Sequence, residues 1–456
     1  MTDDDADQAA SAEPAEHDER RAALKSWKLW LAPVIAVVIA MGAMAGLYLS
    51  SILDPVKNLS SFPIAVVNED QGAAGPTGEQ NLGDTMQTTV EQKVDRDKVS
   101  LENLSWADAQ EKMRDGDVYG TIRVPADFSA KTMALAEGAM TPTPVERPQV
   151  IVYTNPRSGT LGSSLVTALS KEALAEMNRQ IGDQLTAAVA EQTAAMTPRP
   201  AVSGAAATVL ASPVDIVSTT FDPLPAGTGM GLSAFYFALL VLLAGFTGAM
   251  LINSLVDSSL GYIASEIGPR VIVRKSLDLT RTSVLLIKWA IMVAASLVVS
   301  GAYIGIAAAL DMPIDHGWAL WAYSALAASA VGITAMAVIS AFGTIGLLIN
   351  MFVFIFLGLP SAGATTPIQA APGFFAWLAS FEPLHQVYEA IRAILYFDAR
   401  GSAGLTHGLV MTVIGLAIGV VLGLGVNWYY DHKGLSRATV SELTQPQLSR
   451  RNVNPS

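Results

Sequence analysis

The sequence predicts an α-helical polytopic membrane protein with six transmembrane helices in a 1+5 arrangement and an extracytoplasmic α/β domain inserted after the first helix. Of the 456 residues, 51% are hydrophobic and 15% are charged, whereas ordinary soluble proteins have about 25% charged residues. The mean hydropathy is +0.40. Several uncharged runs reach the ~20 residues that a spanning helix needs. Between the first two runs lies a segment far longer than an ordinary connection, which indicates a folded domain.

The first predicted span covers residues 29–53. Its apolar core is longer than the ~7–15 residues of a signal peptide, so we interpret it as an uncleaved anchor. The other five spans form a permease-like membrane domain over residues 229–430. They are expected within Pro223–Val256, Trp289–Leu310, residues 318–341, residues 344–359 and Gly401–Tyr430, with the third and fourth of these folded back near Gly343.

Orientation follows from lysine and arginine residues in the short flanks, which favour the cytoplasmic side. Three such clusters fall on one side of a six-helix protein: Arg20, Arg21, Lys25 and Lys28; Arg270, Arg274, Lys275, Arg281 and Lys288; and Lys433 and Arg437. The sequence therefore predicts a multi-pass protein of the plasma or inner membrane. The N-tail (residues 1–28) and the C-tail (residues 431–456) are both expected in the cytoplasm.

The segment 54–228 is predicted to be the extracytoplasmic α/β domain. Three runs rich in β-branched and aromatic residues predict strands at Pro63–Asn68, Val118–Val124 and Pro148–Thr154. A helix is expected at Ser105–Gly116, and a longer helix with apolar residues mostly four apart runs from about Gly162 to Ala194. That long helix either packs on the domain or serves as a dimerisation arm. Residues 197–228 have the composition of a linker.

Composition excludes several kinds of chemistry. The formal charge of −12 gives no basic face for nucleic acid, and the absence of cysteine removes disulfides and thiolate metal sites. The five histidines are scattered, so we expect no metal site. No phosphate-binding loop, GxSxG or HExxH motif occurs, so we expect no cofactor, no catalytic residues and no enzyme activity. The predicted span cores also lack charged residues, which argues against gradient-driven transport.

Residues 358–397 form a broken segment, because prolines and glycines divide it into short helical pieces. Pro367 and Pro383 mark two of the breaks. Glu389 and Arg392 are three residues apart and are expected to pair on one helix face. The segment predicts a re-entrant or interfacial pair of helices. Its charges either cap an interfacial helix at the membrane surface or form a gate for substrate.

Two motifs follow the first span: AVVNEDQGA at residues 65–73 and VYGTIRVPADFS at residues 118–129. With the order of spans and the broken segment, they resemble the YhgE/Pip (phage infection protein) family, which is similar to the permease subunits of type-2 ABC exporters. The resemblance covers about residues 30–430. The long coil-rich outer insertion of many members is much reduced here.

The first motif also has a purely local interpretation. Asn68 and Asp70 can bond to nearby backbone and Gly72 can take a positive φ, which makes a turn after a strand. The other interpretation is that this motif, with Glu69, binds a cation or a partner.

The loop between the second and third spans carries Glu266, Arg270 and Arg274. The resemblance implies that Glu266 and Arg270 lie on a short helix that docks a separate ATP-binding subunit. The other interpretation is that the positive charges of the loop only set topology.

The function that these observations favour is the permease subunit of an ABC-type exporter. It is expected to form a homodimer, to contact membrane lipids, to take energy from a separate ATPase and to move a lipid-like or amphipathic substrate. The rival is a non-transporting membrane scaffold or surface receptor, acting in phage infection or secretion.

Overall fold

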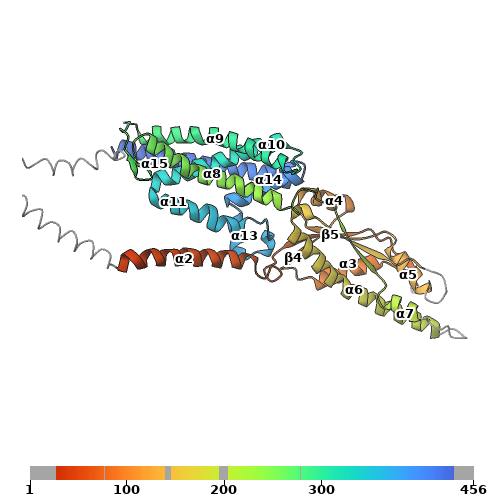
Figure 1. The fold of residues 1–456 in the computed structure, drawn as a ribbon. Helices are drawn as coiled ribbons and strands as arrows, with labels where there is room; N and C mark the ends of the chain where they lie inside the picture. Colours follow the sequence, from red (N-terminus) through yellow and green to blue (C-terminus); the bar gives the residue numbers. More distant parts are fainter. Residues whose placement is uncertain (1–26, 76–77, 139–144, 195–203, 278, 436–456) are drawn as a thin grey trace, which may run out of the picture. The chain divides into compact units, whose positions relative to one another are not determined.

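The computed structural model describes residues 27–75, 78–138, 145–194, 204–277 and 279–435 (Figure 1). Most of the predicted N-tail and C-tail, and the start of the predicted linker, lie outside these residues. The chain divides into two units, Met1–Leu53 and Asp54–Ser456. In the first unit the described element is helix α2 (Trp27–Ile52), which contains Pro33 and whose apolar span is Pro33–Ile52.

The second unit begins with a five-stranded sheet in the order β4-β1-β5-β6-β7. Strand β1 pairs in parallel with β4 and β5, β6 is antiparallel to β5, and β7 is parallel to β6. The strands are β1 (Phe62–Asn68), β4 (Val99–Asn103), β5 (Gly120–Val124), β6 (Gln149–Thr154) and β7 (Asp215–Thr220). The three predicted strands are therefore confirmed as β1, β5 and β6.

Helices cover both faces of this sheet. One core joins the sheet to α3 (Leu82–Lys93), α5 (Phe128–Gly138) and α6 (Thr160–Ala194), and a smaller core on the opposite face joins it to α4 (Trp106–Asp115). Alternation along β1 explains the division, because Ile64 belongs to the first core and Ala65 to the second. Helix α4 begins as predicted, with Ser105 accepting from the Asp108 N–H.

The long predicted helix is α6, and its apolar stripe is buried in the larger core. The buried residues include Leu165, Leu174, Met177, Ile181, Leu185 and Val189. Packing on the domain is therefore confirmed, while the dimerisation arm stays a prediction.

The linker prediction for residues 197–228 is wrong in part. Helix α7 (Gly204–Ala211) and strand β7 lie in this segment, and β7 closes the edge of the sheet against β6. Two short strands, β2 (Ala73–Gly75) and β3 (Gly78–Gln80), form a hairpin after β1. The short β-branched run in β7 becomes a strand because β6 supplies its hydrogen bonds, and composition alone does not reveal that partner.

Six helices in the described part of the chain are long and apolar enough to cross a membrane, so the protein is a multi-pass membrane protein. One of them, α2, precedes the strands and five follow. The five are α8 (Leu232–Ser259), α9 (Arg281–Ala309), α10 (Gly317–Phe342), the continuous run α11 (Thr344–Met351), η2 (Phe352–Leu357) and α12 (Gly358–Ser361), and α15 (Thr406–His432), which follows the short η4 (Gly401–Leu405).

Helix α10 is the centre of this bundle, with 67% of its most apolar window buried, compared with 17% for the window that contains α15. Its many alanine, serine and glycine residues let neighbouring helices approach closely, and α8, α9 and α15 pack on it (Figure 1). The predicted fold-back is confirmed, because α10 ends at Gly343, whose φ is 61°. A positive φ at this position favours glycine.

The broken segment is divided into short helices, as its prolines predict, and three of them follow α12. They are η3 (Ile368–Ala370), α13 (Gly373–Ala379) and α14 (Pro383–Tyr396). Helix α14 is the most buried of them and packs against α8, α10 and α15.

Candidate functional site

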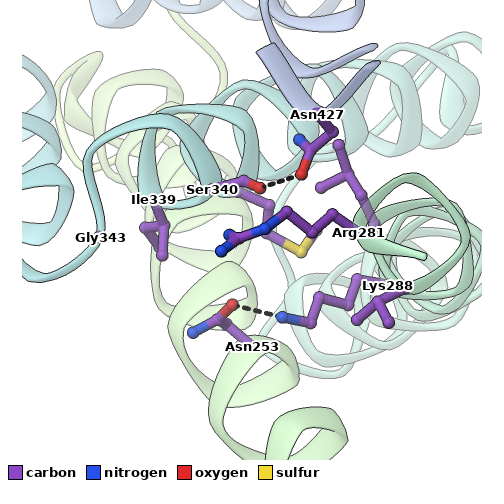
Figure 2. A pocket seen from close by; sticks show the side chains of 10 residues that line it. Asn253, Arg281, Lys288, Ile339, Ser340, Gly343 and Asn427 are labelled. Carbon is purple, nitrogen blue, oxygen red and sulfur yellow. Dashed lines mark hydrogen bonds between the residues drawn. The ribbon is translucent and has the colours of Figure 1, made fainter. Parts of the chain in front are cut away.

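A polar pocket of about 90 Å³ lies among α8, α9, α10 and α15, near the loop that joins α8 to α9 (Figure 2). This volume holds a few water molecules or a small ion. Four helices contribute to its lining, which consists of Asn253, Arg281, Val284, Leu285, Lys288, Met336, Ile339, Ser340, Gly343 and Asn427.

A buried ion pair lies beside this pocket. The Lys288 Nζ is 2.7 Å from the Asp257 Oδ1 and also donates to the Asn253 Oδ1 at 2.7 Å (Figure 2 shows the second contact). The two charged side chains are only 5% and 3% exposed. Since a buried charge requires a partner, each of these residues depends on the other. The pair joins α8 to α9.

The uncharged runs predict spans that exclude these two charges, whereas the structure continues the helices past them. Asp257 follows the uncharged run of the second span, and Lys288 precedes that of the third. In the sequence, the pair is indicated only by the position of its members: Asp257 directly follows one apolar run and Lys288 directly precedes the next. The span cores as predicted remain uncharged, but the helices that contain them carry a buried charge at one end.

Further polar contacts tie the same helix ends together. Asp431 of α15 accepts from the backbone N–H groups of Arg281 and Thr282, at 3.0 and 3.1 Å, and so caps the first turn of α9. The Ser340 hydroxyl of α10 donates to the Asn427 Oδ1 of α15 at 2.8 Å (Figure 2). These capping and bridging residues were not singled out from the sequence.

The predicted short helix at Glu266 and Arg270 is wrong. The structure forms a β-hairpin there, in which β8 (Ser265–Ile267) pairs with β9 (Arg270–Ile272) and Glu266 lies opposite Val271. Isoleucine and valine favour strands, and the intervening Gly268 turns with a φ of 58°. Glu266, Arg270 and Arg274 are all exposed.

The hairpin also exposes large apolar side chains. We define the hairpin patch as Ile263, Ile267, Val271, Ile272 and Val273, each of which is at least 40% exposed. Its base is held in place by the Tyr262 hydroxyl, which donates to the carbonyl oxygens of Leu277 and Leu279 at 2.8 and 3.2 Å. The structure thus presents an apolar surface with charged neighbours on a tethered hairpin.

The outer-domain motif forms the turn of the local interpretation through Asn68 and Gly72, but Asp70 bonds to segments distant in the chain rather than to nearby backbone. The Asn68 Oδ1 accepts from the Asp70 N–H at 3.1 Å, and Gly72 has a φ of 74°. The Asp70 carboxylate is 9% exposed and accepts from the N–H groups of Gly83 and Ser129, both at 2.9 Å, and from the Ser129 hydroxyl. Since Ser129 ends the second motif, the two motifs meet at one buried carboxylate. Its hydrogen bonds are structural.

Glu69 is likewise engaged within the domain. Its Oε2 lies 2.6 Å from an Arg123 Nη atom, and the Arg123 guanidinium stacks 4.5 Å from the centre of the Trp106 ring. Hydrogen bonding to Glu69 keeps the pKa of Arg123 raised although burial opposes it. This ion pair links the turn after β1 to β5.

In the broken segment, the predicted pairing of Glu389 and Arg392 is confirmed, with Oε2 and Nη2 2.9 Å apart. Arg392 is only 7% exposed, so its side chain is enclosed by the protein, and the interpretation as charges that cap an interfacial helix stays a prediction. Pro383 occupies the first position of α14, where its missing N–H costs nothing, and Pro367 precedes η3. A gating role for these residues stays a prediction.

The sheet domain contacts the region around the broken segment through polar side chains. The Tyr119 hydroxyl donates to the Gln369 Oε1 at 2.9 Å, and Arg400 donates to the Asp115 Oδ1 at 2.6 Å. Burial raises the pKa of Tyr119, so its hydroxyl remains a donor at neutral pH. These contacts connect the α/β domain to the membrane domain within the second unit.

A second cavity, of about 150 Å³, lies in the membrane domain between α10, η2, α14 and α15. Its lining is mainly apolar, with Thr334, Gln386 and Thr412 as polar members and no charged residue. Within the described ranges, no cluster of three histidine or carboxylate side chains is placed to hold a metal ion.

The chain matches one protein family, and its likeness to a solved structure is weak. A solved domain of a putative ABC type-2 transporter from Thermotoga maritima matches with 16% identity and a TM-score of 0.23, over 35% of this chain and 85% of that one. No curated protein matches the sequence. The resemblance to the YhgE/Pip family stays a prediction. The family model of proteins of unknown function DUF3533 matches residues 33–419, and the chain belongs to that family.

Proposed function

We propose that this protein is the membrane permease subunit of an ABC-type exporter, which moves a lipid-like or amphipathic substrate with energy from a separate ATP-binding subunit. The observation that carries the proposal is the hairpin patch. Exposed apolar patches with polar rims mark sites of protein association. In the proposed orientation both termini and the hairpin are cytoplasmic, where ATP is available, and the α/β domain lies outside the cell.

The proposed energy source, a separate ATPase, is supported by the missing phosphate-binding loop and by the pairing of the buried charges. Its sequence contains no phosphate-binding loop, so a nucleotide would have to be bound by a partner. The buried Lys288 is already neutralised by Asp257. In the proposed mechanism this pair holds α8 to α9 rather than carrying protons.

In the proposed mechanism, a movement of the hairpin is transmitted to the membrane helices. Its base is tethered through Tyr262, and the loop leads directly into α9, whose first turn Asp431 of α15 caps. A displacement of the docked hairpin would therefore act on the ends of α8, α9 and α15 together.

The proposed substrate class and oligomeric state rest on the second cavity. Its uncharged, mainly apolar lining suits an apolar chain better than an ion. Its volume of about 150 Å³ is below the ~300–1,000 Å³ of typical small-molecule sites. A passage for a whole amphiphile would then form between two copies of the chain, which is why we propose a homodimer.

Docking is tested by affinity purification of tagged full-length protein from its native membranes, with the co-purifying ATP-binding subunit quantified. Truncating one member of a buried interfacial charge pair costs ~2–5 kcal/mol. Glu266→Ala should thus reduce recovery by one to several powers of ten at limiting concentration. Glu79→Ala, an exposed carboxylate of the α/β domain, is the matched control.

The same preparation separates docking from topology. A loop that only sets topology responds to Arg270→Gln with Arg274→Gln and ignores Glu266→Ala. If Glu266→Ala leaves recovery of the ATPase and resistance to toxic amphiphiles unchanged, docking through Glu266 is wrong and the scaffold or receptor alternative gains. In vesicles, transport should need ATP and the partner and should persist when the proton gradient is collapsed. Transport that is uncoupler-sensitive and independent of ATP would refute the energy source.

A further inference from the structure

The α/β domain contains a hollow of about 500 Å³, much larger than either cavity of the membrane domain. Its lining comes mainly from the edge strand β4, helices α3 and α6 and the segments beside them. Its volume is in the ~300–1,000 Å³ range of small-molecule sites. The inner wall is apolar and includes Leu59, Ile64, Val90, Val99 and Ile122, each at most 5% exposed.

One polar group lies inside this apolar wall without a partner. Ser170 of α6 lines the hollow and is 2% exposed, and its hydroxyl makes no hydrogen bond to the described residues. Buried hydroxyls are almost always hydrogen-bonded, because leaving one unpaired costs about 1–3 kcal/mol.

The rim of the hollow carries two lysines, Lys93 at the end of α3 and Lys98 just before β4. Within the described part of the chain, no carboxylate lies at ion-pair distance from either ammonium group.

Acidic residues on the same rim are mostly engaged with their own neighbours. Glu176 pairs with Arg179 at 2.7 Å, and Asp95 accepts from the Asp97 N–H at 3.1 Å. Glu172 is the third carboxylate of the lining. The lining thus carries two lysines and three carboxylates, of which Glu176 has an ion-pair partner. We assign the head-group contacts to Lys93 and Lys98 because neither ammonium group is ion-paired within the described residues, and both stand at the entrance to an apolar space.

We propose that this hollow binds a single-chain amphiphile with an anionic head group, its chain against the apolar wall and its head group at Lys93 and Lys98. As the place where substrate is held outside the membrane, the site rests on the proposed export function. Binding itself requires neither ATP nor the ATP-binding subunit.

The test uses full-length protein in phosphatidylcholine nanodiscs, with dansyl-undecanoic acid as the fluorescent probe and empty nanodiscs as the blank. The probe should bind saturably and be displaced by fatty acids. The affinity of the competing fatty acid should rise about fourfold for each added methylene, since burial of one methylene contributes ~0.8 kcal/mol. Dodecanol, with the same chain length as lauric acid and no charge, should compete less well than lauric acid.

Variants then locate the site. Ala173→Phe fills the hollow and should weaken binding at least tenfold, whereas Ala168→Phe on the exposed face of the same helix should not. Replacing both Lys93 and Lys98 with glutamine should weaken the binding of lauric acid roughly threefold to tenfold and leave the binding of dodecanol unchanged. Lys171→Gln, an exposed lysine outside the lining, is the charge control.

Absence of saturable binding above the blank would overturn the inference, as would equal binding by the Ala173→Phe and wild-type proteins. Equal competition by dodecanol and lauric acid would overturn the assignment of an anionic head group. If Ala173→Phe fails to fold, the paired lysine variant decides the question by its effect on lauric acid alone. Binding that persists while ATP-dependent transport is absent would refute the export function and leave this site standing.

Discussion

We expect Asp257 and Lys288 to be strongly coupled, so that removing one of the two charges lowers the free energy of unfolding more than removing both. The change that tests this is a double-mutant cycle with Asp257→Leu, Lys288→Met and the double variant. Each single substitution leaves one charge in a place where the side chains are 5% exposed or less. The double substitution removes both charges and keeps the site apolar.

The expected magnitude follows from the geometry. At 2.7 Å, the attraction of two unit charges is about 6 kcal/mol with an effective dielectric constant of ~20. Desolvation of the two ions, at several kcal/mol each, offsets most of this attraction. Breaking such a pair by removing one member costs ~3–5 kcal/mol, whereas replacing the whole pair with apolar residues is often neutral.

The assay is thermal unfolding of the purified full-length protein, followed by loss of the monodisperse species. A loss of 3–5 kcal/mol corresponds to a fall in Tm of roughly 6–20 °C for each single variant, and the double variant should unfold close to the wild-type temperature. The partly exposed pair Lys112–Glu102, with side chains 37% and 30% exposed, is the matched control, with an expected coupling within about 1 kcal/mol. Additive effects of Asp257→Leu and Lys288→Met would refute the reasoning, because they would mean that neither charge depends on the other.

Three further predictions concern orientation, the outer-domain turn and a buried acid. Reporters at Asp127 and Arg274 should read outside and inside the cell respectively, and a cytoplasmic reading at Asp127 would overturn the proposed topology. Asp70→Ala removes the acceptor of three hydrogen bonds and should cost the α/β domain roughly 3 kcal/mol, seen as faster proteolysis, while the exposed Glu79→Ala should match the wild type. Burial raises the pKa of Glu382, between the fifth and sixth apolar helices, from 4.5 to about 7. The native state then holds the proton more tightly than the unfolded state, so the free energy of unfolding should fall by roughly 3 kcal/mol as pH rises between these values. Glu382→Gln should abolish that slope, and a slope that survives the substitution would exclude this carboxyl as its source.

The apolar helices and several elements of the α/β domain could be predicted because their signals are local. A run of ~20 apolar residues identifies a span from its own length. The turn after β1 follows from the side chain of Asn68 and from the positive φ of Gly72, and the fold-back follows from a glycine at 343. Each of these depends on residues close together in the chain, so no partner has to be known in advance.

The loop and the charged residues could not be predicted in the same way. Glu266 lies on a strand because β8 and β9 pair across a turn, whereas the short helix expected there was implied by the family resemblance. Residues 215–220 form a strand because β6 is available beside them. Asp257 and Lys288 were visible only as the ends of two apolar runs.

The sequence by itself thus determined which segments are apolar enough to enter a membrane and where the chain turns. The tertiary structure decided which charges are buried, that Asp257 faces Lys288, that the two outer motifs meet at Asp70, and that a hollow opens between β4, α3 and α6. The physical reason is that the run length and periodicity of apolar residues are properties of a single segment. The free energy of a charge, a strand edge or a cavity depends on what another segment places opposite it.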